Sequence, residues 1–319
     1  AMPTTDFSPQ RADVVQLLNR QGIPVVGWIV LPQEQGYYLT ADDAPQAAAR
    51  VADFEAWTTI YGLRWTAVGL DIEPNFAELA RLQSRKWRLI KTLLDRSVNF
   101  HRISRARKAY SILIDRIRSH GYPVQIYRMP YVPAERSVHS TLPDRLLGTV
   151  DVRGDQDYLM LYTSYARPVG AGMIWSLGPR AWGIGIGSTD GNADPGTGSG
   201  PLDWNEFSRD LIVASHFTRQ IGVYDLEGCV HQGFLPRLLA MDWSQSVVIP
   251  KESARRAARF GFIARSILWI VSNLIYLVSA SFLLIGWLLW FRRARRRSTM
   301  DSARPRKASL SPEVRSNLS

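Results

Sequence analysis

Two acidic residues stand two positions apart at the end of an apolar run, AVGLDIE (67–73). Side chains two apart on a β-strand point to the same face, so Asp71 and Glu73 are expected to lie side by side. Two carboxyl groups held close cannot both ionise freely, so one pKa rises toward the working pH. Such a protonated carboxyl group can protonate the leaving oxygen in glycoside cleavage. The sequence therefore predicts Glu73 as a general acid and Asp71 as its partner.

Glu227 offers a further carboxyl group for the same chemistry. It follows Asp225 by two positions in the later run IGVYDLEG (221–228), so these two side chains also share a face. A carboxylate about 5–5.5 Å from Glu73 would act as the nucleophile of a retaining reaction, and one about 6.5–9.5 Å away would suit inversion. The structural alternative for Glu73 is an ion pair with an arginine such as Arg128, because a buried charge is costly unless it is paired.

Candidate substrate contacts also follow the apolar runs. Glu34, Tyr131 and Asp225 come at or just after the ends of three of them. Aromatic side chains could stack on sugar rings, although core packing is the usual role of a single aromatic residue. The aromatic candidates are Tyr37, Tyr38, Tyr127, Tyr131, Tyr162 and Trp243.

Six short β-rich runs alternate with helical stretches through the first 250 residues. The runs cover 25–31, 67–73, 124–129, 157–164, 181–188 and 221–228. Near-continuous apolar strands separated by helices indicate an α/β fold with a parallel sheet, whose active site forms where the strands end. The glycine cluster GIGIG (183–187) lies inside a run and lacks the turn of a nucleotide site. A (β/α)8 TIM-type barrel with six visible strands is expected, without a cofactor.

Two of the run ends resemble motifs of family 18 glycoside hydrolases, the chitinase-like (β/α)8 barrels. The fourth strand of that family carries Asp-x-x-Asp-x-Asp-x-Glu. Here the aligned stretch is TAVGLDIE (66–73), which matches the last two acids but has Thr66 and Gly69 in place of the others. The sixth strand of the family carries Met-x-Tyr-Asp, and here Tyr162 matches whereas Thr163 replaces the Asp.

The resemblance implies roles for two residues. Glu73 would be the general acid, Tyr162 would contact the substrate, and the N-acetyl group of the substrate would attack the anomeric carbon. Counting from a fourth strand at Asp71 places Tyr162 on the sixth and leaves two strands missing before residue 1, so a truncated chain is expected. The two absent family acids favour an alternative: an inactive barrel that serves as a membrane-tethered glycan-binding or cell-envelope scaffold protein.

An uncharged apolar segment, ILWIVSNLIYLVSASFLLIGWLLWF (267–291), lies near the C-terminus. About 20 apolar residues span a bilayer as a helix, so one transmembrane helix is expected. A basic juxtamembrane linker (251–266) precedes it and a basic, disordered tail (292–319) follows it. The tail carries the larger number of flanking arginines. The positive-inside rule therefore places the tail in the cytoplasm and the barrel domain (1–250) outside.

The formal charge of +11 lies, on net, in residues 251–319, because acidic and basic residues balance in 1–250. Within 1–250, the stretch 78–119 has a balance of +9. This stretch could be a solvated helical face, or it could contact anionic lipid or an anionic wall polymer. No nucleic-acid-binding motif accompanies it.

The single cysteine, Cys229, excludes an internal disulfide, and the five histidines lack metal-ligand spacing, so no metal is expected. The expected partners are a polysaccharide or glycan and the lipid bilayer. Nothing in the sequence sets the oligomeric state.

Overall fold

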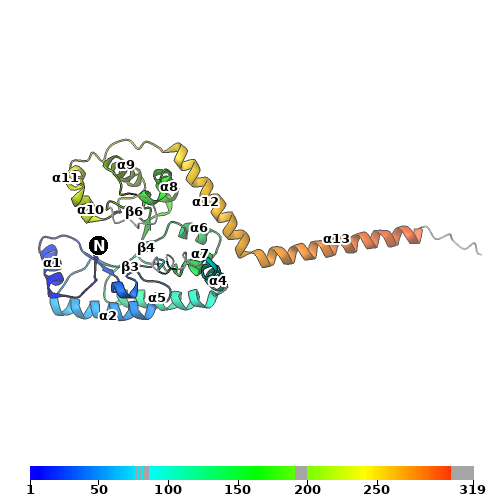
Figure 1. Ribbon diagram of the computed structural model, residues 1–319, viewed down its shortest axis with the longest axis horizontal. Coiled ribbons are helices and arrows are strands. Elements are labelled where there is room, and N and C mark those ends of the chain that lie inside the picture. Colours follow the sequence, from blue (N-terminus) through cyan, green and yellow to red (C-terminus); the bar gives the residue numbers. More distant parts are fainter. Residues whose placement is uncertain (76–77, 79–80, 82–85, 191–199, 303–319) are drawn as a thin grey trace, which may run out of the picture. The chain divides into compact units, whose positions relative to one another are not determined.

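The computed structural model describes residues 1–75, 78, 81, 86–190 and 200–302, and it divides into two compact units, Ala1–Trp269 and Ile270–Ser319 (Figure 1). The first unit contains a seven-stranded parallel sheet whose strands follow one another in chain order. The strands are β1 (Met2–Pro3), β2 (Val26–Ile29), β3 (Ala67–Asp71), β4 (Val124–Arg128), β5 (Gln156–Met160), β6 (Gly183–Gly187) and β7 (Ile221–Tyr224). The predicted α/β class and parallel sheet are confirmed.

The sheet curls as a half-barrel and is not closed. Each described strand pairs only with its neighbours in sequence, so β7 forms no ladder with β1. The structure also adds a strand to the six that the sequence predicts. That strand, β1, pairs Met2 with Gly27 and Pro3 with Trp28. Two residues are too few to form an apolar run, which explains why the pattern of the sequence does not indicate β1.

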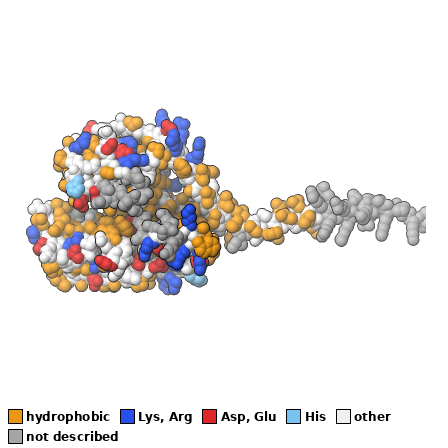
Figure 2. Space-filling view, viewed as in Figure 1, with side chains coloured by type: hydrophobic (Ala, Val, Ile, Leu, Met, Phe, Trp, Pro, Cys, Tyr) orange, Lys and Arg blue, Asp and Glu red, His pale blue; other side chains and the backbone are white. Residues whose placement is uncertain are grey.

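Helices alternate with the strands, as the sequence predicts, and two short helices follow β7. The helices are α1 (Pro9–Arg20), α2 (Ala44–Tyr61), α4 (Lys86–Ser97), α5 (Phe100–Ser119), α6 (Val132–Ser137), α7 (Leu142–Leu147), α8 (Gly170–Leu177), α9 (Trp204–Ser215), α10 (Leu226–His231) and α11 (Phe234–Leu239). Short 3-10 turns are η1 (Gln33–Gln35), η2 (Thr163–Ala166) and η3 (Gly178–Arg180). A break at Asn99 separates α4 from α5, because the Asn99 side chain accepts the backbone N–H of Arg102 at 3.1 Å and caps α5. Basic and acidic side chains are interspersed on the face of the first unit shown in Figure 2.

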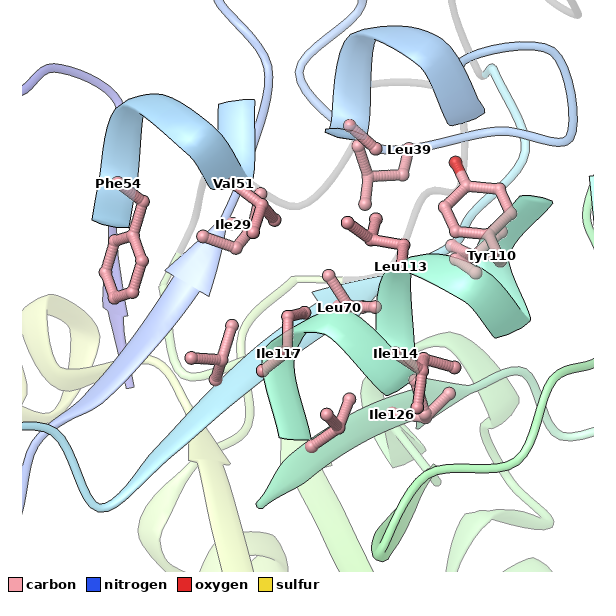
Figure 3. Packing of buried hydrophobic residues seen from close by; sticks show 14 of the residues in the cluster. Ile29, Leu39, Val51, Phe54, Leu70, Tyr110, Leu113, Ile114, Ile117 and Ile126 are labelled. Atoms are coloured by element: carbon pink, nitrogen blue, oxygen red, sulfur yellow. The ribbon is translucent and has the colours of Figure 1, made fainter. Parts of the chain in front are cut away.

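The hydrophobic core lies between the outer face of the sheet and the helices. Alternate strand residues such as Leu70 and Ile126 pack against Ile114 and Ile117 of α5 (Figure 3). A second cluster packs β5 and β6 against α9 and α11, with Ile184 and Phe207 fully buried. Because strand side chains alternate, this packing directs Gly69 and Asp71 to the opposite, inner face.

Helix α9 begins with a capping box that ties it to the preceding loop. The Asp203 side chain accepts the backbone N–H of Glu206 at 2.8 Å, and the Glu206 side chain accepts that of Asp203 at 3.3 Å. Replacing Asp203 by alanine is expected to lower the free energy of unfolding by about 1 kcal/mol. Chemical denaturation would measure the loss, with Asn205→Ala as the exposed control in the same turn. Equal effects of the two substitutions would contradict the capping role.

The apolar C-terminal segment forms two helices rather than the single predicted one. They are α12 (Lys251–Ser272) and α13 (Leu274–Ser302), and they are separated at Asn273. The Asn273 N–H bonds to the Ile270 carbonyl at 3.2 Å, a tighter turn than an α-helix makes, and the Asn273 carbonyl accepts the Leu277 N–H at 2.9 Å. Among the described residues no single helix is long and apolar enough to cross a membrane. The bent pair Lys251–Ser272 and Tyr276–Trp290 meets that requirement only together.

The predicted linker at 251–266 belongs to α12, and its first turn packs on α8. A Cβ atom on Gly172 would lie 2.1 Å from the Ser253 carbonyl carbon, and the Ser176 hydroxyl donates to the Ala254 carbonyl at 3.4 Å. The beginning of α12 is therefore part of the first unit.

Candidate active site

The predicted acid pair lies at the carboxyl end of β3. Asp71 is the last residue of the strand, and Glu73 follows two positions later. The neighbouring segment keeps the chain extended through Glu73. The Leu39 N–H donates to the Asp71 carbonyl at 3.1 Å, and the Glu73 N–H donates to the Leu39 carbonyl at 2.9 Å. The two carboxyl groups therefore share the inner face, and both are buried, with exposed fractions of 4% and 8%.

The two carboxyl groups interact directly, and both pKa values are raised. Burial raises the pKa of Glu73 to about 7, and the hydrogen bond from Asp71 partly opposes that rise. The pKa of Asp71 is also raised, first by burial and then by the charge of Glu73 and the hydrogen bond to it. In the hydrogen bond between the two side chains, Asp71 is the donor and Glu73 is the acceptor. Near neutral pH, Glu73 is the group that gains and loses a proton.

The indole of Trp28, on β2, contributes a smaller effect that lowers the pKa of Asp71. This effect comes from a hydrogen bond between the Trp28 indole and the buried Asp71 side chain.

Tyrosine rings surround the acid pair. Burial raises the pKa of Tyr38, Tyr127 and Tyr162, and the Asp71 carboxylate adds to the rise in each case. Tyr162 stacks on Tyr224 with ring centroids 5.5 Å apart and planes at 26°. Glu73 raises the pKa of Tyr38, Tyr162 and Tyr224, which places all three hydroxyl groups within its electrostatic reach. The structure therefore brings Tyr162 to Asp71 and Glu73.

Glycines on the inner face make room for these rings. A Cβ atom on Gly185 would lie 3.3 Å from Tyr162, and one on Gly187 would lie 3.4 Å from the same ring. A Cβ atom on Gly183 would lie closer still to a ring, 2.6 Å from Tyr158. The cluster GIGIG is thus a β6 strand whose inner face is cleared for aromatic side chains. Glycine inside a strand marks close approach of another group, and this was the available signal for a ring-lined face.

Gly69, on β3, likewise makes room for an aromatic ring. A Cβ atom there would lie 2.9 Å from Tyr127 Cε2 and 3.1 Å from its hydroxyl, which donates to Gln125 Oε1 at 3.0 Å. Gly69 occupies one of the positions at which the family 18 motif has an acid. The ring of Tyr127 therefore fills the space that such an acid would need.

Gly69→Ala is expected to lower the free energy of unfolding by about 1–3 kcal/mol, because the ring of Tyr127 must shift. In a Tyr127→Ala background the same change should cost clearly less, since the obstructing ring is gone. Denaturation of the two single variants and the double variant completes the cycle. Additive costs would contradict the proposed contact.

The structural alternative for Glu73 does not hold. Arg128 is buried and pairs with Asp151 and with Asp157, whose carboxylate lies 2.7 Å from Nη2. Arg136 also binds Asp151, at 2.7 Å. Among the described basic residues none forms an ion pair with Glu73. Arg128, which was the candidate partner of Glu73, instead links β4 to the loop before β5.

The other predicted substrate contacts, Tyr131 and Asp225, form hydrogen bonds of their own with neighbouring residues. Tyr131 donates to or accepts from Thr149 Oγ1 at 2.7 Å, and Glu73 contributes to the rise of its pKa. Asp225 raises the pKa of Tyr224, but its carboxylate accepts the Gly228 N–H at 2.8 Å and caps α10. These residues border the site.

Glu227 and Glu34 do not join the acid pair. Glu227 is exposed in the first turn of α10, because Asp225 ends the extended chain and starts that helix. Glu34 is exposed on η1. Trp243 is exposed in the segment after α11. Asp71 is the one described carboxyl group that acts on the pKa of Glu73.

Two further residues of the site, Trp28 and Tyr224, were not among those predicted. Each lies within an apolar run and looks like a core residue in the sequence.

The described part of the chain contains no group of three or more His, Cys, Asp or Glu side chains that could hold a metal ion. Comparison with known proteins assigns no family, because no family model, curated protein or solved structure matches the chain.

Proposed function

We propose that this protein is a glycoside hydrolase of the family 18 type that cleaves O-glycosidic bonds in a polysaccharide or glycan. The observation that carries the proposal is the buried acid pair Asp71–Glu73, in which Glu73 titrates at about pH 7 at the end of a parallel strand. A carboxyl group with such a pKa can act first as an acid and then as a base near neutral pH.

The reaction needs one proton transfer and one nucleophile. Protonated Glu73 gives its proton to the glycosidic oxygen, and the bond from that oxygen to the anomeric carbon breaks. The nearest second carboxyl group, Asp71, holds its proton and donates a hydrogen bond to Glu73, so it is a poor nucleophile. The N-acetyl oxygen of the substrate then forms the new bond to the anomeric carbon. Glu73 accepts a proton from the water that later opens this intermediate.

The rings around Glu73 would hold the sugar. Tyr38, Tyr162 and Tyr224 are partly exposed, and the rings of Tyr162 and Tyr224 stack on each other. The Tyr162 hydroxyl is the substrate contact that the family motif implies. Stacking on aromatic faces and a hydroxyl near the acid would orient the ring for protonation.

The proposed architecture is a (β/α)8 barrel domain at 1–250, joined by a membrane anchor to a cytoplasmic tail. The open curl of seven parallel strands supports the barrel type. The apolar composition of the bent pair, Lys251–Ser272 and Tyr276–Trp290, supports the anchor. The flanking arginines support an extracytoplasmic barrel domain.

The proposal is tested with pairs of substrates. The full chain, purified in detergent, would be given oligomers of N-acetylglucosamine and the matched N-deacetylated oligomers, and released reducing ends would be measured. Cleavage restricted to the acetylated member is the expected result. Equal cleavage of both would contradict attack by the N-acetyl group.

A non-catalytic glycan-binding scaffold is the second candidate. The observation that favours it is the ring of Tyr127, which occupies the space of a family acid at Gly69. This candidate predicts glycan binding without release of reducing ends, and the binding would be unaltered by Glu73→Gln. Isothermal titration with the same oligomers, run beside the cleavage assay, separates the two functions.

A further inference from the structure

Helix α4 (Lys86–Ser97) has no buried residue and carries an exposed apolar stripe. Trp87, Ile90 and Leu94 are 76%, 50% and 63% exposed. They stand at positions i, i+3 and i+7, so they lie on one side of the helix. Val98 and Phe100, also exposed, extend the apolar surface past the end of the helix. Figure 2 shows hydrophobic and basic side chains together where Figure 1 labels α4.

The basic residues of α4 border this stripe. Lys86 and Lys91 flank it on its two sides in a helical projection, and both are exposed. Neither lysine, nor the exposed Arg88, forms an ion pair with a residue that the structure describes. By contrast, Arg96 is neutralised by Glu78 at 2.8 Å. The outer side of α4 therefore combines uncompensated positive charge with large apolar side chains.

We propose that α4 is an interfacial helix that lays this stripe into the surface of an anionic phospholipid bilayer. A helix with lysines beside a Trp-containing apolar stripe buries the stripe at the level of the head groups while the lysines meet lipid phosphates. The tryptophan suits this depth, because its ring is amphipathic. An anionic soluble polymer would neutralise the lysines but would leave Trp87, Ile90 and Leu94 in water.

This contact is separate from the apolar pair of helices at the C-terminus and does not depend on the glycosidase proposal. It concerns residues of the first unit alone. It gives the strongly basic stretch 78–119 a specific role. Several arginines of that stretch serve internal ion pairs, such as Arg116 with Glu55 at 2.5 Å, whereas the lysines of α4 face outward.

The test compares two neighbouring positions of α4, which point about 100° apart around the helix, in the full chain. An environment-sensitive NBD fluorophore is attached at Leu94→Cys in the stripe, or at Asp95→Cys away from it, in a Cys229→Ala background. Each protein is reconstituted in phosphatidylcholine vesicles with or without phosphatidylglycerol. The expected result is a blue shift and a several-fold rise in emission at position 94 only, and only in the anionic vesicles.

Charge variants sharpen the comparison. Lys86→Glu with Lys91→Glu should abolish the rise at position 94, as should roughly 1 M salt, in which the Debye length falls to about 3 Å. The matched control places the same charge changes at Arg105 and Lys108, which are exposed on α5, and should retain most of the rise. Equal responses at positions 94 and 95, or equal responses in neutral and anionic vesicles, would overturn the proposal. A full response to soluble polyglutamate without vesicles would also overturn it, in favour of a polymer partner.

Discussion

Replacing Glu73 by glutamine is expected to lower the turnover of the glycan about 10²–10⁴-fold, the usual contribution of a general acid. Glutamine nearly matches glutamate in shape and can still accept the hydrogen bond from Asp71, but it cannot deliver a proton to the leaving oxygen. The site should therefore stay assembled while the chemistry is lost. Initial rates of reducing-end release would measure the loss, and circular dichroism with thermal unfolding would verify the fold.

The pH profile of the unsubstituted protein gives an independent readout of the same group. Turnover should decline as the pH rises past about 7, because Glu73 then loses the proton that it must donate. The residual activity of Glu73→Gln should lack this decline.

Glu227→Gln is the matched control for removing a carboxylate. Glu227 is exposed on α10, so its substitution should leave the rate unchanged. A loss as large as that of Glu73→Gln would instead make Glu227 a direct nucleophile. Undiminished hydrolysis by Glu73→Gln would remove Glu73 from the mechanism altogether.

The sequence predicts the acid pair because strand alternation is a local rule. Asp71 and Glu73 share a face whenever the chain is extended, and the backbone bonds of Leu39 keep it extended there. The same rule gives a wrong expectation for Glu227. Asp225 has the residue type that caps a helix, so the chain turns into α10 before Glu227 is reached. Competition between an extended run and a helix cap is decided by the surrounding structure.

The ring-lined face depends on the curl of the whole sheet. Trp28, Tyr127 and Tyr224 come from three different strands, and they meet around Asp71 because the sheet bends toward its inner side. A single aromatic residue in an apolar run does not indicate which face it occupies. The glycines at 185 and 187 carried that information, since a strand that lacks side chains on one face leaves room for rings from its neighbours.

The apolar C-terminal segment shows a different limit of prediction from the sequence. Its composition predicts a membrane helix, and composition does not register where a helix breaks. Asn273 is one polar residue in that segment, and it ends α12 by taking part in a tighter turn. The side chains of asparagine compete for backbone hydrogen bonds, which disfavours a helix interior.

Thermal stability is expected to fall as the pH rises from about 5 to about 9, because buried carboxyl groups in the folded chain hold their protons. Burial raises the pKa of Glu73 to about 7 and that of Glu135 to about 9. It also raises the pKa of Asp71, Asp144 and Asp210. In the unfolded chain these groups titrate near their ordinary values of 3.8 and 4.5.

The sign follows from proton counting. Between the unfolded and folded pKa values the native state binds more protons than the unfolded state, so the free energy of unfolding decreases with rising pH. For Glu73 alone, a rise from 4.5 to about 7 corresponds to about 3 kcal/mol, which is fully available below pH 4.5 and lost above pH 7. Exposed carboxylates such as Asp155, which is bound by Arg118, have lowered pKa values, so their contribution to stability is lost as the pH falls in the acid range. Stability should therefore be highest near pH 5.

Melting temperatures at pH 5, 7 and 9 in buffers of equal ionic strength would measure the decline. In the double variant Asp71→Asn/Glu73→Gln the decline between pH 5 and 7 should flatten, because neither side chain then titrates. The remaining decline toward pH 9 should persist, because burial and the charge of Asp144 still raise the pKa of Glu135 to about 9. A melting temperature that rises from pH 5 to 9, or a double variant with an unaltered slope, would show that the acid pair is ionised in the folded protein and cannot supply a proton near neutral pH.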